Sequence, residues 1–186
     1  MRTAHRAQSL NRFLAATVGS FLVAMSPGVG VAAADEQDPR SVVETYVRAL
    51  DSGDAVGAAS VFTDTAIHIH PIAAGACSRQ SPCIGRKAIL DDLRNRTVDH
   101  QCLTLLDVLV NGSIVRGNAE LRNDTLRAIG IERMLVSSTW LVVGGKAAAL
   151  FVVPDLSDPQ TAASAAISAG MQDPGAPPSS PTSSCS

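Results

Sequence analysis

The segment after residue 41 places its apolar residues on one side of a helix. Four of them follow one another at spacings of three, one and three residues: Val43, Tyr46, Val47 and Leu50. This spacing gives one apolar stripe on a helical surface. Because Ser41 and Glu44 stand in the arrangement of a capping box, we expect a helix over residues 42–51 that Ser41 caps.

Shorter helices and a strand follow this first helix. Asp54 can cap a second helix over residues 55–62, and residues 86–94 carry the apolar spacing of a third. Between them, residues 66–70 alternate in the manner of a strand, which Pro71 ends. Four longer strands are predicted after residue 100: 101–110, 113–121, 132–143 and 146–153.

Tight turns are predicted to join the later strands in pairs. Asn111-Gly112 is a strong hairpin signal, and Gly144-Gly145 is a second one. Helices followed by hairpin-linked strands indicate an α+β fold with an antiparallel sheet. We expect this sheet to curve around the three N-terminal helices and to form a cone with one open end.

The N-terminal segment does not belong to the predicted domain. Residues 1–12 contain three arginines and no acidic residue, and an apolar run over residues 13–25 leads to small residues at Ala32 and Ala34. This order predicts a secretory signal peptide over residues 1–34. A membrane anchor is the alternative, but the run is shorter than the ~20 residues that span a bilayer. We expect a secreted, periplasmic or cell-envelope protein that meets the membrane only transiently, through the signal peptide.

Composition sets the domain limits and excludes one class of partner. Residues 35–156 form the predicted domain, and residues 157–186, which are rich in Ala, Ser and Pro, are expected to be a largely disordered tail with a weak helix over 161–171. The net charge is −2 and the pI is near 6.0, so no nucleic acid is expected as a partner. Aromatic residues make up only 3% of the chain, which predicts an aliphatic interior.

The cysteines indicate one structural crosslink. Cys77 and Cys83 flank a loop without hydrophobic periodicity, and in an oxidising compartment we expect them to form a disulfide. Cys102 lies in an apolar run and is expected to be a small buried hydrophobe, whereas the pairing of Cys185 stays open. No C-x-x-C motif occurs, and no cofactor is expected.

Two histidines offer the clearest candidate chemistry. His68 and His70 share one face of the predicted strand, and Ile67 and Ile69 share the other. Either face can be the interior one. A neutral imidazole is present near pH 7 and accepts a proton, so His70 is a candidate general base. A metal half-site is the alternative, but no third ligand stands at a telling spacing, so no metal is expected.

Charged residues of the third predicted helix are interpreted as surface. Asp91 and Asp92 are adjacent and therefore do not face each other on a helix, which favours a solvated face. Arg94 and Arg96 are expected to be their surface partners. On the third long strand, Trp140 is either part of the core or a platform for a ligand.

Several short segments together resemble a known family. They are YVRALDSGD in the first helix, FTDTA before the first strand, Pro71 after it, and GRKAI at the start of the third helix. These segments are similar to the SnoaL-like and ketosteroid-isomerase-like branch of the NTF2-like superfamily. The resemblance covers residues 41–154, and it implies a cone-shaped fold of cystatin-like topology.

The resemblance also implies roles for particular residues. Tyr46 stands where the isomerases have a tyrosine that donates to an enolate oxygen, and His70 stands where they have an aspartate base. Ser138 occupies the place of a second oxyanion donor. Because two of these three residue types depart from the family pattern, the isomerase reaction itself does not follow. His68 and Trp140 are expected to contact a ligand.

Three functions fit these observations. The first is an exported enzyme that acts by acid–base catalysis on a small apolar carbonyl compound, as an isomerase or a polyketide-cyclase-like lyase. The second is a module that binds a small apolar ligand without turnover. The third is a domain that forms a homodimer through its sheet face.

Overall fold

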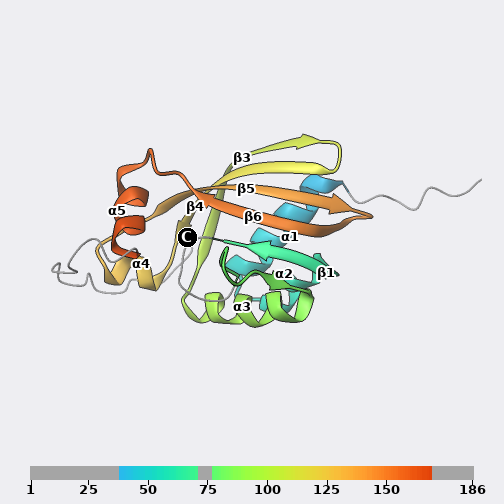
Figure 1. The fold of residues 1–186 in the computed structure, drawn as a ribbon, viewed down its shortest axis with the longest axis horizontal. Helices are drawn as coiled ribbons and strands as arrows, with labels where there is room; N and C mark the ends of the chain where they lie inside the picture. The colour runs from blue at the N-terminus through green and yellow to red at the C-terminus, as the bar shows by residue number, and fades with distance from the viewer. Residues whose placement is uncertain (1–37, 71–76, 169–186) are drawn as a thin grey trace, which may run out of the picture. The chain divides into compact units, whose positions relative to one another are not determined.

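The computed structural model describes residues 38–70 and 77–168. The predicted signal peptide, Pro71, Cys185 and the end of the predicted tail lie outside these residues. Eleven elements follow in order: α1 (Pro39–Asp51), α2 (Ala55–Ser60), β1 (Phe62–Ile69), β2 (Cys83–Ile84), α3 (Arg86–Val98), β3 (Cys102–Asn111), β4 (Ile114–Arg122), α4 (Asp124–Ala128), β5 (Met134–Val143), β6 (Lys146–Pro154) and α5 (Pro159–Ser168) (Figure 1). No helix of the described part is long and apolar enough to cross a membrane.

The strands form one curved, unclosed sheet, which confirms the α+β fold class. The strand order is β2-β1-β6-β5-β4-β3 (Figure 1). The expectation of a wholly antiparallel sheet is wrong at one place, because β1 and β6 run parallel, with Ile67 opposite Ala149 and Ile69 opposite Phe151. No short turn joins these two strands, so no hairpin fixes their direction.

Both predicted hairpin turns are confirmed. Asn111 pairs with Ile114, so β3 and β4 are joined by only two residues, and Gly112 among them has φ +56°. Gly144 has φ +55° between β5 and β6. Residues other than glycine rarely adopt this left-handed conformation, and the turn composition therefore sets the register of both hairpins.

Helix starts agree with the predictions in part. The Asp54 carboxylate accepts a hydrogen bond from the Gly57 N–H at 2.7 Å, as expected of the cap of α2. The prediction for α1 is wrong, because Asp38 is the cap and the Ser41 hydroxyl instead donates to the Asp38 carbonyl at 2.7 Å. Pro39 fits the first turn because it has no N–H to leave unpaired. The sequence analysis missed α4, which Asn123 caps.

The core combines an aliphatic shell with an aromatic centre. The apolar stripe of α1 is buried against the concave side of the sheet, as its periodicity predicts. At the centre, the Tyr46 ring lies 5.0 Å from the Trp140 ring and 5.8 Å from the Phe62 ring, between ring centroids. The expected purely aliphatic interior is therefore corrected at this point, where three of the few aromatic residues gather.

The predicted disulfide is present. Cys77 and Cys83 are bonded, and they fasten the segment after β1 to β2. Cys102 differs from the expectation of a buried thiol, because it is half-buried and disulfide-bonded.

Candidate functional site

Strand β1 and the residue that follows it direct His68 and His70 into the molecule. The exposed fraction is 0% for His68 and 7% for His70, whereas Ile67 on the opposite face is 38% exposed. The side chains of a strand alternate between faces, so burying one histidine buries the other. The interior face of β1 is therefore the histidine face.

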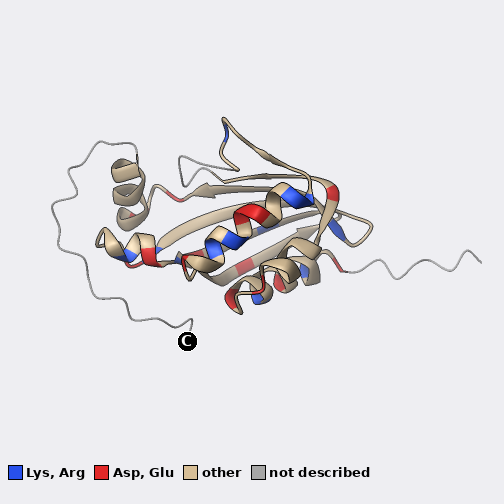
Figure 2. Ribbon diagram, turned by 90° about the horizontal axis from the view of Figure 1, so that it is seen from below, with Lys and Arg blue, Asp and Glu red and all other residues tan. Residues whose placement is uncertain are grey.

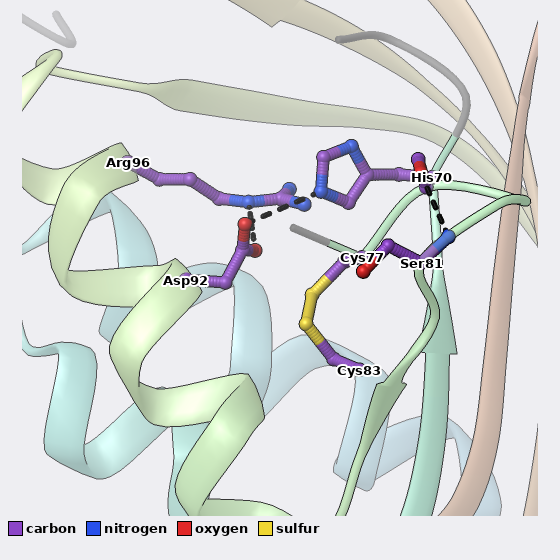
Figure 3. Close-up of a disulfide and its surroundings, with 7 residues drawn as sticks. His70, Cys77, Ser81, Cys83, Asp92 and Arg96 are labelled. Atoms are coloured by element: carbon purple, nitrogen blue, oxygen red, sulfur yellow. Dashed lines mark hydrogen bonds and ion pairs between the residues drawn. A yellow bond between two sulfur atoms is a disulfide. The ribbon is translucent and has the colours of Figure 1, made fainter. Parts of the chain in front are cut away.

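Helix α3 supplies the partners of His70 (Figure 3). The Asp92 carboxylate lies 3.4 Å from His70 Nε2 through one oxygen and accepts a hydrogen bond from Arg96 Nε at 2.7 Å through the other. All three side chains are largely buried, with 12% of the Arg96 side chain exposed. The carboxylate thus joins an imidazole and a guanidinium in one buried network of side chains.

Burial and neighbouring charges set the protonation states of His70 and Asp92. Burial lowers the pKa of His70, and the nearby Arg96 charge lowers it further, against the opposing hydrogen bond to Asp92. Burial would raise the pKa of Asp92, but the hydrogen bond to His70 and the Arg96 charge outweigh it and lower that pKa. Near neutral pH, His70 is therefore neutral and Asp92 is ionised.

The interpretation of Asp92 and Arg96 as surface residues is wrong. Asp92 is 7% exposed, and its carboxylate faces the sheet between buried Ile89 and Leu93. Only Asp91 has the predicted solvated position, where it pairs with Lys87 and Arg94. The spacing Ile89, Asp92 and Arg96 follows the apolar stripe of α3, and this was the signal that could have revealed the inward pair.

A cavity of about 250 Å³ opens beside His70, and we call it the outer cavity. Elements α3, β4, α4 and α5 and residues between elements, including His70 after β1, form its wall. The wall mixes polar and apolar side chains: His70, Asp92, Asn95, Arg96, Asp99, Gln101, Leu121, Asn123, Thr125, Leu126, Ile129, Ser164 and Ser168. Its volume is below the ~300–1,000 Å³ of most sites for drug-sized ligands, so it suits a small molecule.

A second, smaller hollow lies around Tyr46, and we call it the inner cavity. It has a volume of about 40 Å³ and a mainly apolar wall that includes Tyr46, Ser138 and Trp140. Arg96, Gln101 and Leu121 line both cavities and so mark their junction. Burial raises the pKa of Tyr46, so its phenol stays protonated.

The structure thus distributes the predicted site residues over two cavities. His70 lines the outer cavity, whereas Tyr46, Ser138 and Trp140 line the inner one. Ser138 donates its proton to the Gly117 carbonyl at 3.1 Å and accepts a hydrogen bond from Trp140 Nε1 at 3.1 Å. The sequence analysis missed Asp92, Arg96 and Gln101 as site residues.

His68 lies deeper than His70 and contacts the aromatic centre. Its ring stacks on Phe62 with centroids 6.0 Å apart, and neither ring nitrogen has a hydrogen-bond partner among the described residues. Burial, with smaller contributions from Arg96 and His70, lowers the pKa of His68 well below its ordinary value. Potential ligand atoms of His68, Cys77 and Asp92 lie within 4.8 Å of one another. The Cys77 sulfur, however, is part of the disulfide and supplies no thiolate.

Comparisons with known proteins place the fold. No protein-family model matches the chain, and none of the curated proteins does. Among solved structures, IdmH from Streptomyces antibioticus, which carries a provisional polyketide cyclase assignment, is similar with a TM-score of 0.55 and 16% identity, over 69% of this chain and 99% of that one.

Two further solved structures have a similar fold. An LEH-like epoxide hydrolase from M. tuberculosis has a TM-score of 0.52 and 16% identity, over 71% of this chain and 96% of that one. An NTF2-like protein of unknown function from Cytophaga hutchinsonii has a TM-score of 0.52 and 12% identity, over 65% of this chain and 93% of that one. The protein therefore has the fold of the NTF2-like superfamily.

Proposed function

We propose that this protein binds a small carbonyl compound in the outer cavity and acts on it by general base catalysis through His70. The observation that carries the proposal is the contact between His70 Nε2 and the Asp92 carboxylate in the cavity wall. A base oriented by a buried carboxylate is the arrangement that acid–base enzymes use to hold one imidazole tautomer.

The proposed step is the removal of a proton from carbon next to a carbonyl group. With its proton on Nε2 and donated to Asp92, His70 presents an unprotonated Nδ1. This nitrogen takes the proton, the C–H electron pair forms a carbon–carbon double bond, and the carbonyl oxygen becomes an enolate. Return of the proton to a different carbon completes an isomerisation. Alternatively, the enolate carbon attacks a second carbonyl group of the same molecule, whose C=O double bond opens and whose oxygen takes the proton back from His70, which completes a cyclisation.

The reaction class is supported by the similar structures and by the cavity itself. IdmH and the epoxide hydrolase carry cyclase and hydrolase names on the same fold, although a fold by itself does not determine an activity. The mixed lining of the outer cavity favours a ligand with both a polar and an apolar part, rather than the wholly apolar ligand expected from the sequence. Export through the predicted signal peptide fits the disulfide, which is typical of oxidising compartments.

The test follows α-proton exchange of a panel of enolisable ketones in D₂O by NMR. The His70→Gln variant is expected to lose about 10²–10⁴-fold of the exchange rate. Because the active form has neutral His70, kcat/KM is expected to fall as the pH drops through a value below the ordinary ~6.5 of an imidazole. The exposed His100 provides the control, since His100→Gln should leave the rate unchanged. Saturable binding of hydrophobic probes without any exchange would instead identify a non-catalytic binding module.

A second proposal concerns the outer face of the sheet, which we expect to bind a second copy of the chain. Phe151 and Val153 of β6 are each 43% exposed on the face opposite buried Leu150, and Leu141 of β5 is 36% exposed. Strand β5 has no charged residue, and charged residues gather on the helices instead (Figure 2). Light scattering of the full chain should give a dimer, and Phe151→Lys should give a monomer. A wild-type monomer at all concentrations would contradict this proposal.

A further inference from the structure

Two buried hydrogen-bond donors stand at the junction of the cavities. Arg96 Nη2 and Gln101 Nε2 have no hydrogen-bond partner among the described residues, although both atoms are buried. Gln101 is 6% exposed. A buried donor without an acceptor costs about 1–3 kcal/mol, so native proteins rarely keep one without a reason. Two such donors in one cavity wall indicate an acceptor that the chain itself does not supply.

The backbone brings the two residues that carry these donors together. Arg96 lies in the last turn of α3, and Gln101 directly precedes β3. The Gln101 N–H donates to the Arg96 carbonyl at 3.1 Å, which fixes the turn between them. The Nε of Arg96 is already bound to Asp92, so the orientation of the guanidinium is set and Nη2 is left for another partner.

Both residues line the same cavity as the proposed base. Asp92 contacts His70 with one oxygen and Arg96 with the other, so one carboxylate joins the imidazole and the guanidinium (Figure 3). A ligand in the outer cavity can therefore meet a base and two donors at once, which is the geometry that proton removal beside a carbonyl requires.

The charge balance decides what kind of acceptor fits. Asp92 and Asp99 both line the outer cavity, and Arg96 is the one cation among its described lining residues. Asp99 accepts hydrogen bonds from the Thr125 N–H and hydroxyl. With two carboxylates against one guanidinium, a carboxylate ligand is disfavoured and a neutral carbonyl oxygen is favoured.

We propose that Arg96 Nη2 and Gln101 Nε2 form the oxyanion hole of this site, which takes the carbonyl oxygen of a ketone or ester and stabilises its enolate. This inference rests on the proposed function. It assigns the stabilisation of the enolate oxygen to Arg96 and Gln101, and not to Tyr46 and Ser138. As His70 removes the α-proton, the negative charge that develops on the carbonyl oxygen accepts hydrogen bonds from both donors.

A phenol tests the hole without turnover, because it enters the cavity as a neutral molecule and the oxygen of its phenolate form, produced when the proton leaves to solvent, resembles an enolate. The probe is 4-nitrophenol, whose bound phenolate is measured by absorbance on the full chain. Gln101→Leu, which removes one donor, is expected to weaken phenolate binding by about ten- to hundredfold. Arg96→Lys keeps the charge that Asp92 needs but lacks the guanidinium fork, and it should weaken binding similarly.

The controls separate this inference from the proposed function. Gln80→Leu removes an exposed amide that lines neither cavity and should leave phenolate binding unchanged. His70→Gln should still bind the phenolate, because a base is not needed for binding. Phenolate binding that depends on Gln101, in a protein that exchanges no ketone protons, would support the hole and refute the base.

Three results would overturn the hole. One is equal phenolate binding by wild type and Gln101→Leu, which would leave the base proposal standing. Another is loss of binding in Tyr46→Phe rather than in Gln101→Leu, which would place the oxygen in the inner cavity. The third is no phenolate binding by the wild-type protein.

Discussion

The Asp92→Asn variant is expected to lower the free energy of unfolding by about 3–5 kcal/mol, the usual cost of removing one partner from a buried ion pair. Asparagine keeps the shape of the side chain, but it removes the charge and replaces one of the two acceptor oxygens with an N–H donor. The Arg96 guanidinium, with 12% of its side chain exposed, would then lie buried without a counter-charge. Urea unfolding at pH 7 measures the change.

The neighbouring Asp91 is a matched control on the same helix. Its carboxylate is half exposed and its partners Lys87 and Arg94 are on the surface, so Asp91→Asn should leave stability close to the wild-type value. The double variant Asp92→Asn/Arg96→Met removes both buried charges and should be more stable than Asp92→Asn alone. Equal effects of the two asparagine substitutions would mean that Arg96 reaches solvent when Asp92 is neutral.

The His68→Leu variant is expected to be more stable than the wild type by about 1–3 kcal/mol at pH 7, because two unpartnered ring nitrogens leave the core. Leucine is close to histidine in size and fits the apolar contact with Phe62. His68→Gln retains polar atoms in the same place and should bring no such gain. A loss of stability in His68→Leu would show that the ring nitrogens bind a water molecule or a ligand in solution.

The same residue should make the wild type sensitive to acid. The pKa of His68 is lower in the folded than in the unfolded chain, so the unfolded chain binds more protons once the pH falls below ~6.5. Stability is therefore complete above that pH and is lost as the pH falls toward the folded pKa, by at most about 1.4 kcal/mol per pH unit for this group. The nearby charges of Arg96, His70 and Asp92 also act on the pKa of His68. Between pH 7.5 and 5, the free energy of unfolding should change less steeply with pH in His68→Leu than in the wild type.

Much of the fold could be predicted from the sequence because its signals are local. The stripe that includes Tyr46 and Leu50 determined which side of α1 is buried, and the glycines at 112 and 144 determined where the chain reverses. The alternation over residues 66–70 put His68 and His70 on one face, but it could not say whether that face was interior. Pattern alone gives the two faces of a strand without saying which one another element covers.

The candidate site was predictable only in part, for a related reason. A charged residue on a helix is normally solvated, and the adjacent Asp91 and Asp92 look alike in the sequence. They differ because His70, 22 residues away, approaches one of them and leaves the other in solvent. Both carboxylates have a cation within four residues, Lys87 or Arg94 for Asp91 and Arg96 for Asp92, so the local charge pattern does not tell which pair is buried.

The sequence by itself determined the order and type of most elements, the two hairpins and the Cys77–Cys83 crosslink, since each depends on residues close together in the chain. The tertiary structure alone decided that β6 runs parallel to β1, that Asp92 and Arg96 turn inward, and that Gln101 joins them between two cavities. These features arise from contacts between segments far apart in the chain, where burial, charge and hydrogen bonding must be satisfied together.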